Sequence, residues 1–157
     1  MKDHPGQTVE RKYPMTRVLL SVAMVLSAWV GVAAQSAVTF VGHDKVAEAL
    51  AKGGSLVTAS NLTVSGNHRM VPGQVEVHEK ETDILYIMEG HATIVTGGTM
   101  VGGRQTGPGQ LRGTDVQGGE SRRLQKGDVI VIPAGIPHWF KEVSPTVNYF
   151  TVKVIRQ

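Results

Sequence analysis

The sequence predicts an all-β fold, a barrel or a sandwich of short strands, preceded by a short helix. Its 157 residues suffice for one domain with a core of useful size. After the first 34 residues, short runs rich in Val, Ile and Thr alternate with Gly, Pro or Asn, which is typical of strands joined by turns. Glycine occurs 19 times and aromatic residues make up only 5%, a composition that suits small β-barrels and sandwiches.

The helix is predicted over 44–52, where Val46 and Leu50 are spaced i and i+4 and Gly53-Gly54 follows as a stop signal. Period-two alternation and flanking turn residues predict the strands. These runs cover 56–57, 62–64, 75–78, 84–88, 92–96, 129–132, 138–141 and 147–155.

The segment 97–119 interrupts this pattern with nine glycines and few apolar residues. We expect a long glycine-rich loop here, since loops of this length in compact domains are usually lids, binding loops or disordered excursions. The composition does not discriminate between a functional lid and a surface excursion.

Residues 1–34 have the features of a secretory signal peptide. Basic residues, Arg11, Lys12 and Arg17, precede an apolar stretch over 18–32, and Val32-Ala33-Ala34 offers small residues for cleavage. We expect export to the periplasm or the medium. The alternative is an uncleaved membrane anchor, although the apolar stretch is short of the ~20 residues that a span needs.

The charge distribution argues against nucleic acid as a partner. The sequence pI is about 9.3, but residues 1–34 carry four basic and two acidic side chains, a net of +2. The remaining chain has 12 Lys+Arg and 11 Asp+Glu, a net of +1, and so lacks a strong field for phosphates. The absence of cysteine excludes disulfides, so stability must come from the core or from a metal.

A group of histidines and carboxylates is the main candidate site. Glu76 and His78 are two residues apart and therefore share one face of a strand, and Asp83 follows five residues later. His138 enters another strand directly after a Pro/Gly turn. Lys80 would continue the face of Glu76 and His78, and is a candidate catalytic residue for acid–base chemistry or anion binding.

Two spaced motifs carry a family resemblance. The first reads Glu76-Val77-His78, four residues, Asp83, six residues, Gly90. The second reads Gly127, five residues, Pro133-Ala134-Gly135, two residues, His138, three residues, Glu142. Over residues 73–142 they resemble the two motifs of the cupin family. The usual first His is replaced here by Glu76, the usual Glu by Asp83 and the closing Asn by Glu142.

The resemblance implies a single jelly-roll barrel of two antiparallel sheets over 35–157, and a homodimer. It also places metal ligands at Glu76, His78, Asp83 and His138. These donors suit one divalent transition metal, Mn, Fe, Ni or Zn. A barrel that has kept the shape and lost the metal is the alternative, although such crowded carboxylates and imidazoles would shift their protonation without a cation.

Two functions follow as hypotheses. The first is an exported metal-dependent enzyme that acts on a small polar or oxygenated molecule, with dioxygenase, isomerase or lyase chemistry. The second is a non-catalytic protein that binds a metal or ligand, because this fold hosts both roles. In either case the expected partner is a small molecule, with no nucleic acid, and with a membrane only through an uncleaved leader.

Overall fold

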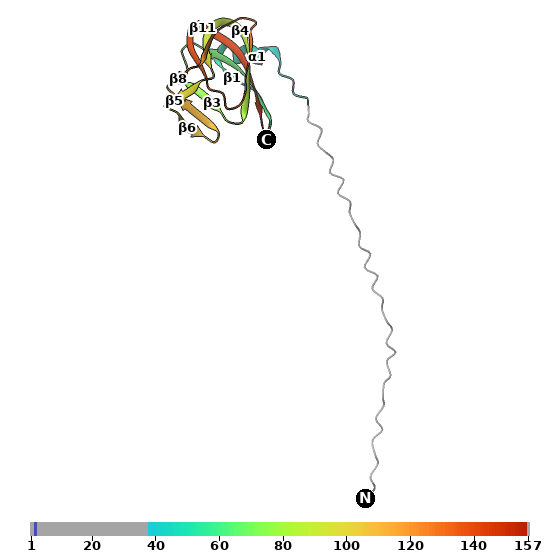
Figure 1. Ribbon diagram of the computed structural model, residues 1–157. Coiled ribbons are helices and arrows are strands. Elements are labelled where there is room, and N and C mark those ends of the chain that lie inside the picture. The colour runs from blue at the N-terminus through green and yellow to red at the C-terminus, as the bar shows by residue number, and fades with distance from the viewer. Residues whose placement is uncertain (1, 3–37, 157) are drawn as a thin grey trace. The chain divides into compact units, whose positions relative to one another are not determined.

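The structure is a computed structural model that describes Lys2 and residues 38–156, and the latter hold one α-helix and eleven strands (Figure 1). The predicted signal peptide over 1–34 lies, apart from Lys2, outside the described residues. Within the described part of the chain, no helix combines the length and the apolar character needed to cross a bilayer.

The elements follow one another in this order. They are α1 (His43–Lys52), β1 (Gly54–Thr58), β2 (Leu62–Arg69), β3 (Val75–His78), β4 (Glu81–Thr96), β5 (Thr99–Val101), β6 (Arg104–Gly107), β7 (Gln110–Gly113), β8 (Asp115–Gln117), β9 (Glu120–Gln125), β10 (Val129–Ile132) and β11 (His138–Ile155). The predictions of one short helix and an otherwise all-β chain are confirmed.

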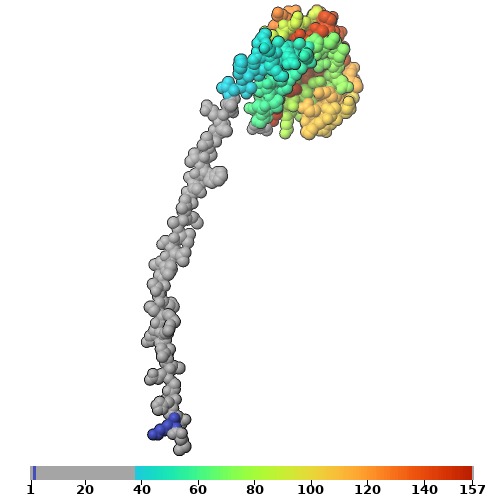
Figure 2. All heavy atoms as spheres, turned by 180° about the vertical axis from the view of Figure 1, so that it is seen from behind, coloured from blue at the N-terminus to red at the C-terminus, as the bar shows by residue number. Residues whose placement is uncertain are grey.

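Helix α1 packs against β2 at the surface of the molecule, where it appears in cyan beside the green strands (Figure 2). The helix ends at Gly53, whose N–H donates to the carbonyl of Ala49 over 2.9 Å. A Cβ atom on Gly66 of β2 would come within 2.8 Å of the Ala49 backbone. Glycine at position 66 therefore allows the helix to approach the strand at backbone distance.

The long strands β4 and β11 pair with each other along most of their length and connect the two layers of the barrel. One layer has the order β1-β2-β11-β4-β10, through the second half of β11 and the first half of β4. The other has the order β6-β7-β3-β11-β4-β9, through the opposite halves. The pairing of the two long strands is irregular between Val143 and Val147, opposite Gly90. Each strand continues through this point from one layer into the other, so the predicted antiparallel sheets are joined by continuous strands.

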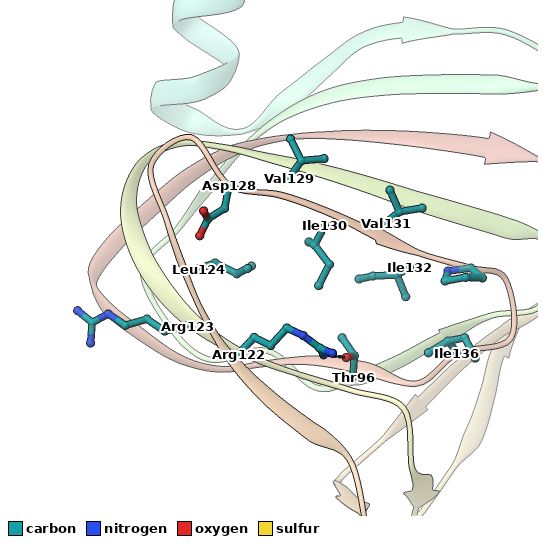
Figure 3. Close-up of a pocket in the computed structure, with 11 residues that line it drawn as sticks. Thr96, Arg122, Arg123, Leu124, Asp128, Val129, Ile130, Val131, Ile132 and Ile136 are labelled. Carbon is teal, nitrogen blue, oxygen red and sulfur yellow. Dashed lines mark hydrogen bonds between the residues drawn. The ribbon is translucent and has the colours of Figure 1, made fainter.

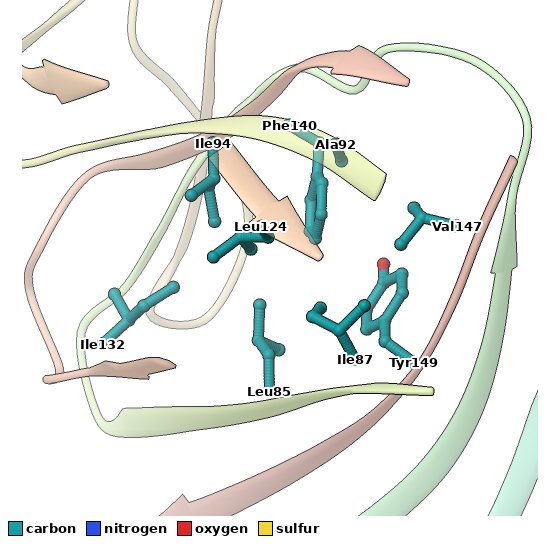
Figure 4. Packing of buried hydrophobic residues seen from close by; sticks show 9 residues of the cluster. All are labelled: Leu85, Ile87, Ala92, Ile94, Leu124, Ile132, Phe140, Val147 and Tyr149. Carbon is teal, nitrogen blue, oxygen red and sulfur yellow. The ribbon is translucent and has the colours of Figure 1, made fainter. Parts of the chain in front are cut away.

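The core lies between these two layers (Figure 4). Side chains of one layer point toward those of the other in the close-up, and Ile87 and Ile94 have no exposed surface. The cluster comprises Leu85, Ile87, Ala92, Ile94, Leu124, Ile132, Phe140, Val147 and Tyr149. Burial of these aliphatic and aromatic side chains supplies most of the driving force for folding.

The glycine-rich segment is more ordered than a loop. It contains β5 to β8: β5 and β8 form a separate two-stranded ribbon, and the β6–β7 hairpin extends the sheet beyond β3. Gly109, with a φ of 68°, makes the tight turn between β6 and β7. These strands have only three or four residues, of which at most two are apolar, so their sequences show no apolar alternation.

Candidate metal centre

Two neighbouring strands place three of the candidate ligands together. Glu76 and His78 lie on β3, and His138 is the first residue of β11, directly opposite Glu76 in the antiparallel register. The turn before β11 is tied to β3, because the N–H of Gly135 donates to the carbonyl of His78 over 2.8 Å. The Pro/Gly turn thereby sets the point at which His138 enters the sheet.

The side chains of these residues converge on one point. The Oε2 atom of Glu76 lies 3.4 Å from Nε2 of His78 and 3.8 Å from Nε2 of His138. One ligand atom from each residue lies within 4.8 Å of the others. Around a tetrahedral ion with bonds of about 2.0–2.2 Å, ligand atoms are about 3.4 Å apart, so the spacing fits a metal better than direct hydrogen bonds.

Asp83, on β4, lies at the same point and has a cationic partner. Its Oδ2 atom is 3.6 Å from Nε2 of His78 and 3.6 Å from Nε2 of His138. Lys153, opposite Asp83 in β11, donates to both carboxylate oxygens, at 2.8 and 3.1 Å, and also lies 2.9 Å from Glu81. The four predicted ligands are thus brought together, but Asp83 is shared with a lysine.

The hydrogen bonds of His78 fix which nitrogen faces the cluster. Gln110 donates its amide to Glu81 over 2.9 Å, so its amide oxygen faces Nδ1 of His78 and accepts a hydrogen bond from it. This leaves Nε2 of His78 facing the cluster, buried and without a hydrogen-bond partner. A buried polar atom without a partner is unfavourable, and a metal ion bound between it and the two carboxylates would satisfy all three groups.

His138 is oriented in the same way. Its Nδ1 atom lies 3.1 Å from the carbonyl of Ile136, to which it donates, so that Nε2 faces Glu76 and Asp83. Burial lowers the pKa of His138, which favours the neutral ring. Burial alone would raise the pKa of Glu76, but the neighbouring His78, Arg112 and His138 lower it to about 2. A neutral imidazole and an ionised carboxylate are the forms that bind metals.

A cavity of about 210 Å³ adjoins the cluster, and Glu76, Asp83 and His138 form part of its lining. Residues of β2, β4, β11 and the β2–β3 connection, among them Arg69 and Lys153, complete the walls. This space gives a small molecule access to three of the four candidate ligands.

A larger hollow of about 690 Å³ lies between β9 and β10 (Figure 3). Its lining is mainly aliphatic, with Arg122 hydrogen-bonded to Thr96 and with Arg123 near the rim. Neither a histidine nor any of the four candidate ligands lines it. The candidate metal ligands therefore lie beside the smaller cavity and not beside the larger hollow.

Lys80 is exposed in the turn between β3 and β4, and it does not line the cavity beside the cluster. The strand ends at His78, so the alternation that placed Lys80 on the same face does not continue. The lysine that reaches the site is Lys153. Sequence reasoning also missed Glu81 and Gln110. Glu81 could have been found from its two-residue spacing to Asp83, whereas Gln110 has no comparable signal.

Comparisons with known proteins address the fold. The family model described as Cupin matches residues 35–155. No curated protein sequence matches this chain. Among solved structures, peruvianin-I, a cysteine peptidase from Thevetia peruviana latex, is 16% identical with a TM-score of 0.42, over 62% of this chain and 52% of that one. This chain therefore spans about half the length of peruvianin-I.

Two further solved structures are similar to the chain. KdgF from Halomonas sp. is 19% identical with a TM-score of 0.48, over 66% of this chain and 79% of that one. The cupin domain of Schizosaccharomyces pombe Cnp3 is 12% identical with a TM-score of 0.49, over 66% and 59%. Since the family model covers well over half of the sequence and the observed fold is a two-layered antiparallel barrel, this chain belongs to the cupin family.

Proposed function

We propose that this cupin is a metal-dependent enzyme that holds one divalent transition metal through Glu76, His78 and His138 and acts on a small polar molecule in the adjoining cavity. The observation that carries the proposal is the buried Nε2 atom of His78. It has no hydrogen-bond partner and lies within 3.6 Å of two carboxylates, where a cation would satisfy all of these groups.

The donor set supports a transition metal with open positions. Two imidazoles and one carboxylate form the three-residue face that suits iron and also accepts Mn, Ni or Zn. Lys153 neutralises part of the charge on Asp83, so we treat Asp83 as a fourth donor of lower strength. When bound, such an ion would polarise a carbonyl or hydroxyl of the substrate as a Lewis acid.

The cavity favours an enzyme over a storage protein. A site for metal storage or structure needs protein ligands on all sides, whereas Glu76 and His138 line an opening of about 210 Å³. The chain's own residues would bind and orient the substrate there. Isomerase, lyase or dioxygenase chemistry on an oxygenated molecule is compatible with this arrangement.

Metal content tests the proposal directly. Protein purified without chelator should contain about one transition-metal ion per chain by elemental analysis, and His78→Ala and His138→Ala should contain almost none. His91→Ala, on β4 outside the cluster, is the matched control and should retain the metal. Added metal at about 100 times its Kd should stabilise the wild type by about 2.7 kcal/mol.

Two results would overturn the proposal. One is wild-type protein that neither contains a transition metal nor is stabilised by added Mn, Fe, Ni or Zn. The other is equal metal content in the wild type and in both cluster variants, which would place the ion elsewhere.

A further inference from the structure

Arg69 is a cationic side chain of the cavity beside the cluster. It is the last residue of β2, is half-buried and lines the same cavity as Glu76 and His138. Among the residues that the structure describes, no carboxylate lies within ion-pair distance of its guanidinium, whereas Lys153 and Arg112 both have acidic partners.

The guanidinium is nevertheless held in one position. Its Nε donates to the hydroxyl of Tyr149 over 3.3 Å, and its carbon lies 4.9 Å from the centre of the Phe140 ring. A Cβ atom at Gly73 would come within 2.9 Å of Nη1, so glycine at position 73 leaves room for the group. These contacts use one N–H and one face of the guanidinium and leave its terminal amino groups available for a ligand.

The charge balance of the cavity indicates the sign of that ligand. Two anionic side chains, Glu76 and Asp83, and two cationic ones, Arg69 and Lys153, line it. A divalent ion at the cluster would leave two positive charges in excess among these lining groups, or one when Glu81, the other partner of Lys153, is counted. An anionic ligand would reduce this excess, and a carboxylate matches the planar donor pattern of arginine.

The volume indicates the size of a ligand, or of the part of a ligand, that the cavity can hold. About 210 Å³ is the space of roughly seven water molecules at about 30 Å³ each. This suits a molecule of about six or seven non-hydrogen atoms. A hydroxy or keto acid of that size has a carboxylate for the guanidinium and a second oxygen for the metal cluster.

We infer that the substrates are small carboxylic acids, hydroxy or keto acids among them, whose carboxylate Arg69 binds through its terminal amino groups. This inference rests on the proposed metal-dependent function, because the same cavity would serve both. Tyr149 and Phe140 act as positioning residues that hold the guanidinium toward the cavity.

Lactate and lactamide are suitable probes, since they have nearly the same size and differ in charge. Calorimetric titrations of the metal-free and the metal-loaded protein should show lactate binding at least about tenfold tighter than lactamide, as expected for a charge-assisted hydrogen bond. Arg69→Gln should lose this preference and bind lactate about tenfold or more weakly. Arg122→Gln, an exposed arginine that pairs with Glu120, is the matched control and should bind lactate as the wild type does.

Metal analysis separates this inference from the proposed function. Arg69→Gln should retain the wild-type metal content, because within the described part of the chain no hydrogen bond or ion pair joins Arg69 to a candidate ligand. The inference is overturned if the wild type binds neither probe, if it does not distinguish lactate from lactamide, or if Arg69→Gln binds lactate as tightly as the wild type. If Arg69→Gln fails to fold, the affinities of the wild type for lactate and lactamide still test the inference. If the wild-type protein contains no metal but still binds lactate more tightly than lactamide, the proposed function is overturned and the inference about Arg69 is not.

Discussion

Gln110 is the residue outside the candidate ligands on which metal binding should depend most. It connects His78 with Glu81, and so presents Nε2 of His78 to the cluster. In Gln110→Leu, the side chain has a similar length but neither donor nor acceptor. The hydrogen bond that selects the Nδ1–H tautomer of His78 is lost, and Glu81 keeps Lys153 as its remaining partner.

The expected magnitude follows from these two contacts. Removal of a partner that orients a ligating histidine typically weakens metal binding 10–100-fold, which corresponds to about 1.4–2.7 kcal/mol. The metal-free protein should lose about 1–3 kcal/mol of unfolding free energy, because the buried Nδ1–H of His78 loses its acceptor and Glu81 loses one of its two partners. The two losses are separable by measuring each protein with and without metal.

Competition with a chelator of known affinity gives the metal Kd, and urea unfolding of the metal-free protein gives its stability. Gln117→Leu, on β8 of the same glycine-rich segment and exposed, is the matched control and should change neither quantity appreciably. Gln110→Glu keeps an acceptor for Nδ1 of His78 and should retain more metal affinity than Gln110→Leu. A wild-type metal Kd in Gln110→Leu would refute the idea that Gln110 orients His78.

Two more predictions concern the charges of the site. Lys153→Met leaves Asp83 without its cation, so the metal-free variant should be less stable by about 1–3 kcal/mol, the cost of a buried acceptor that loses its partner. Asp83 is then free to bind the ion, and calorimetry should show a larger metal-induced rise in Tm than in the wild type; an equal rise would contradict the sharing of Asp83. The pKa of Glu76 is lowered from 4.5 to about 2, so the stability it contributes is present above pH 4.5 and is lost as the pH falls toward 2. The metal-free wild type should lose up to roughly 3 kcal/mol in this window through Glu76. Glu76→Gln should lose less, and identical pH profiles in urea unfolding would argue against an ionised Glu76.

Local spacing was sufficient to predict the part of the site that lies within short segments. The two-residue repeat of a strand places Glu76 and His78 on one side of β3. The turn before His138 can be recognised from its Pro/Gly motif. The same alternation failed at Lys80, since β3 ends two residues earlier. Strand ends are the least certain feature of such predictions because the pairing of strands, rather than the local sequence, decides them.

The contacts that depend on long-range pairing could not be predicted. Lys153 meets Asp83 because β11 and β4 pair in one particular register, across 70 positions of sequence. Gln110 reaches His78 because β7 pairs with β3, although its own segment has the composition of a loop. Polar strands of three or four residues leave no apolar pattern from which such pairing could be inferred.

The β7–β3 pairing also limits how the glycine-rich segment can be redesigned. Gln110 is opposite His78 in the register, and neighbouring side chains of a strand point to opposite faces. Deletion of one residue within β7 would turn this amide away from the imidazole, whereas a two-residue change would preserve its direction. The separate ribbon of β5 and β8 has no such constraint toward β3, so it is the part of this segment where a foreign peptide could be grafted while the candidate metal centre stays intact.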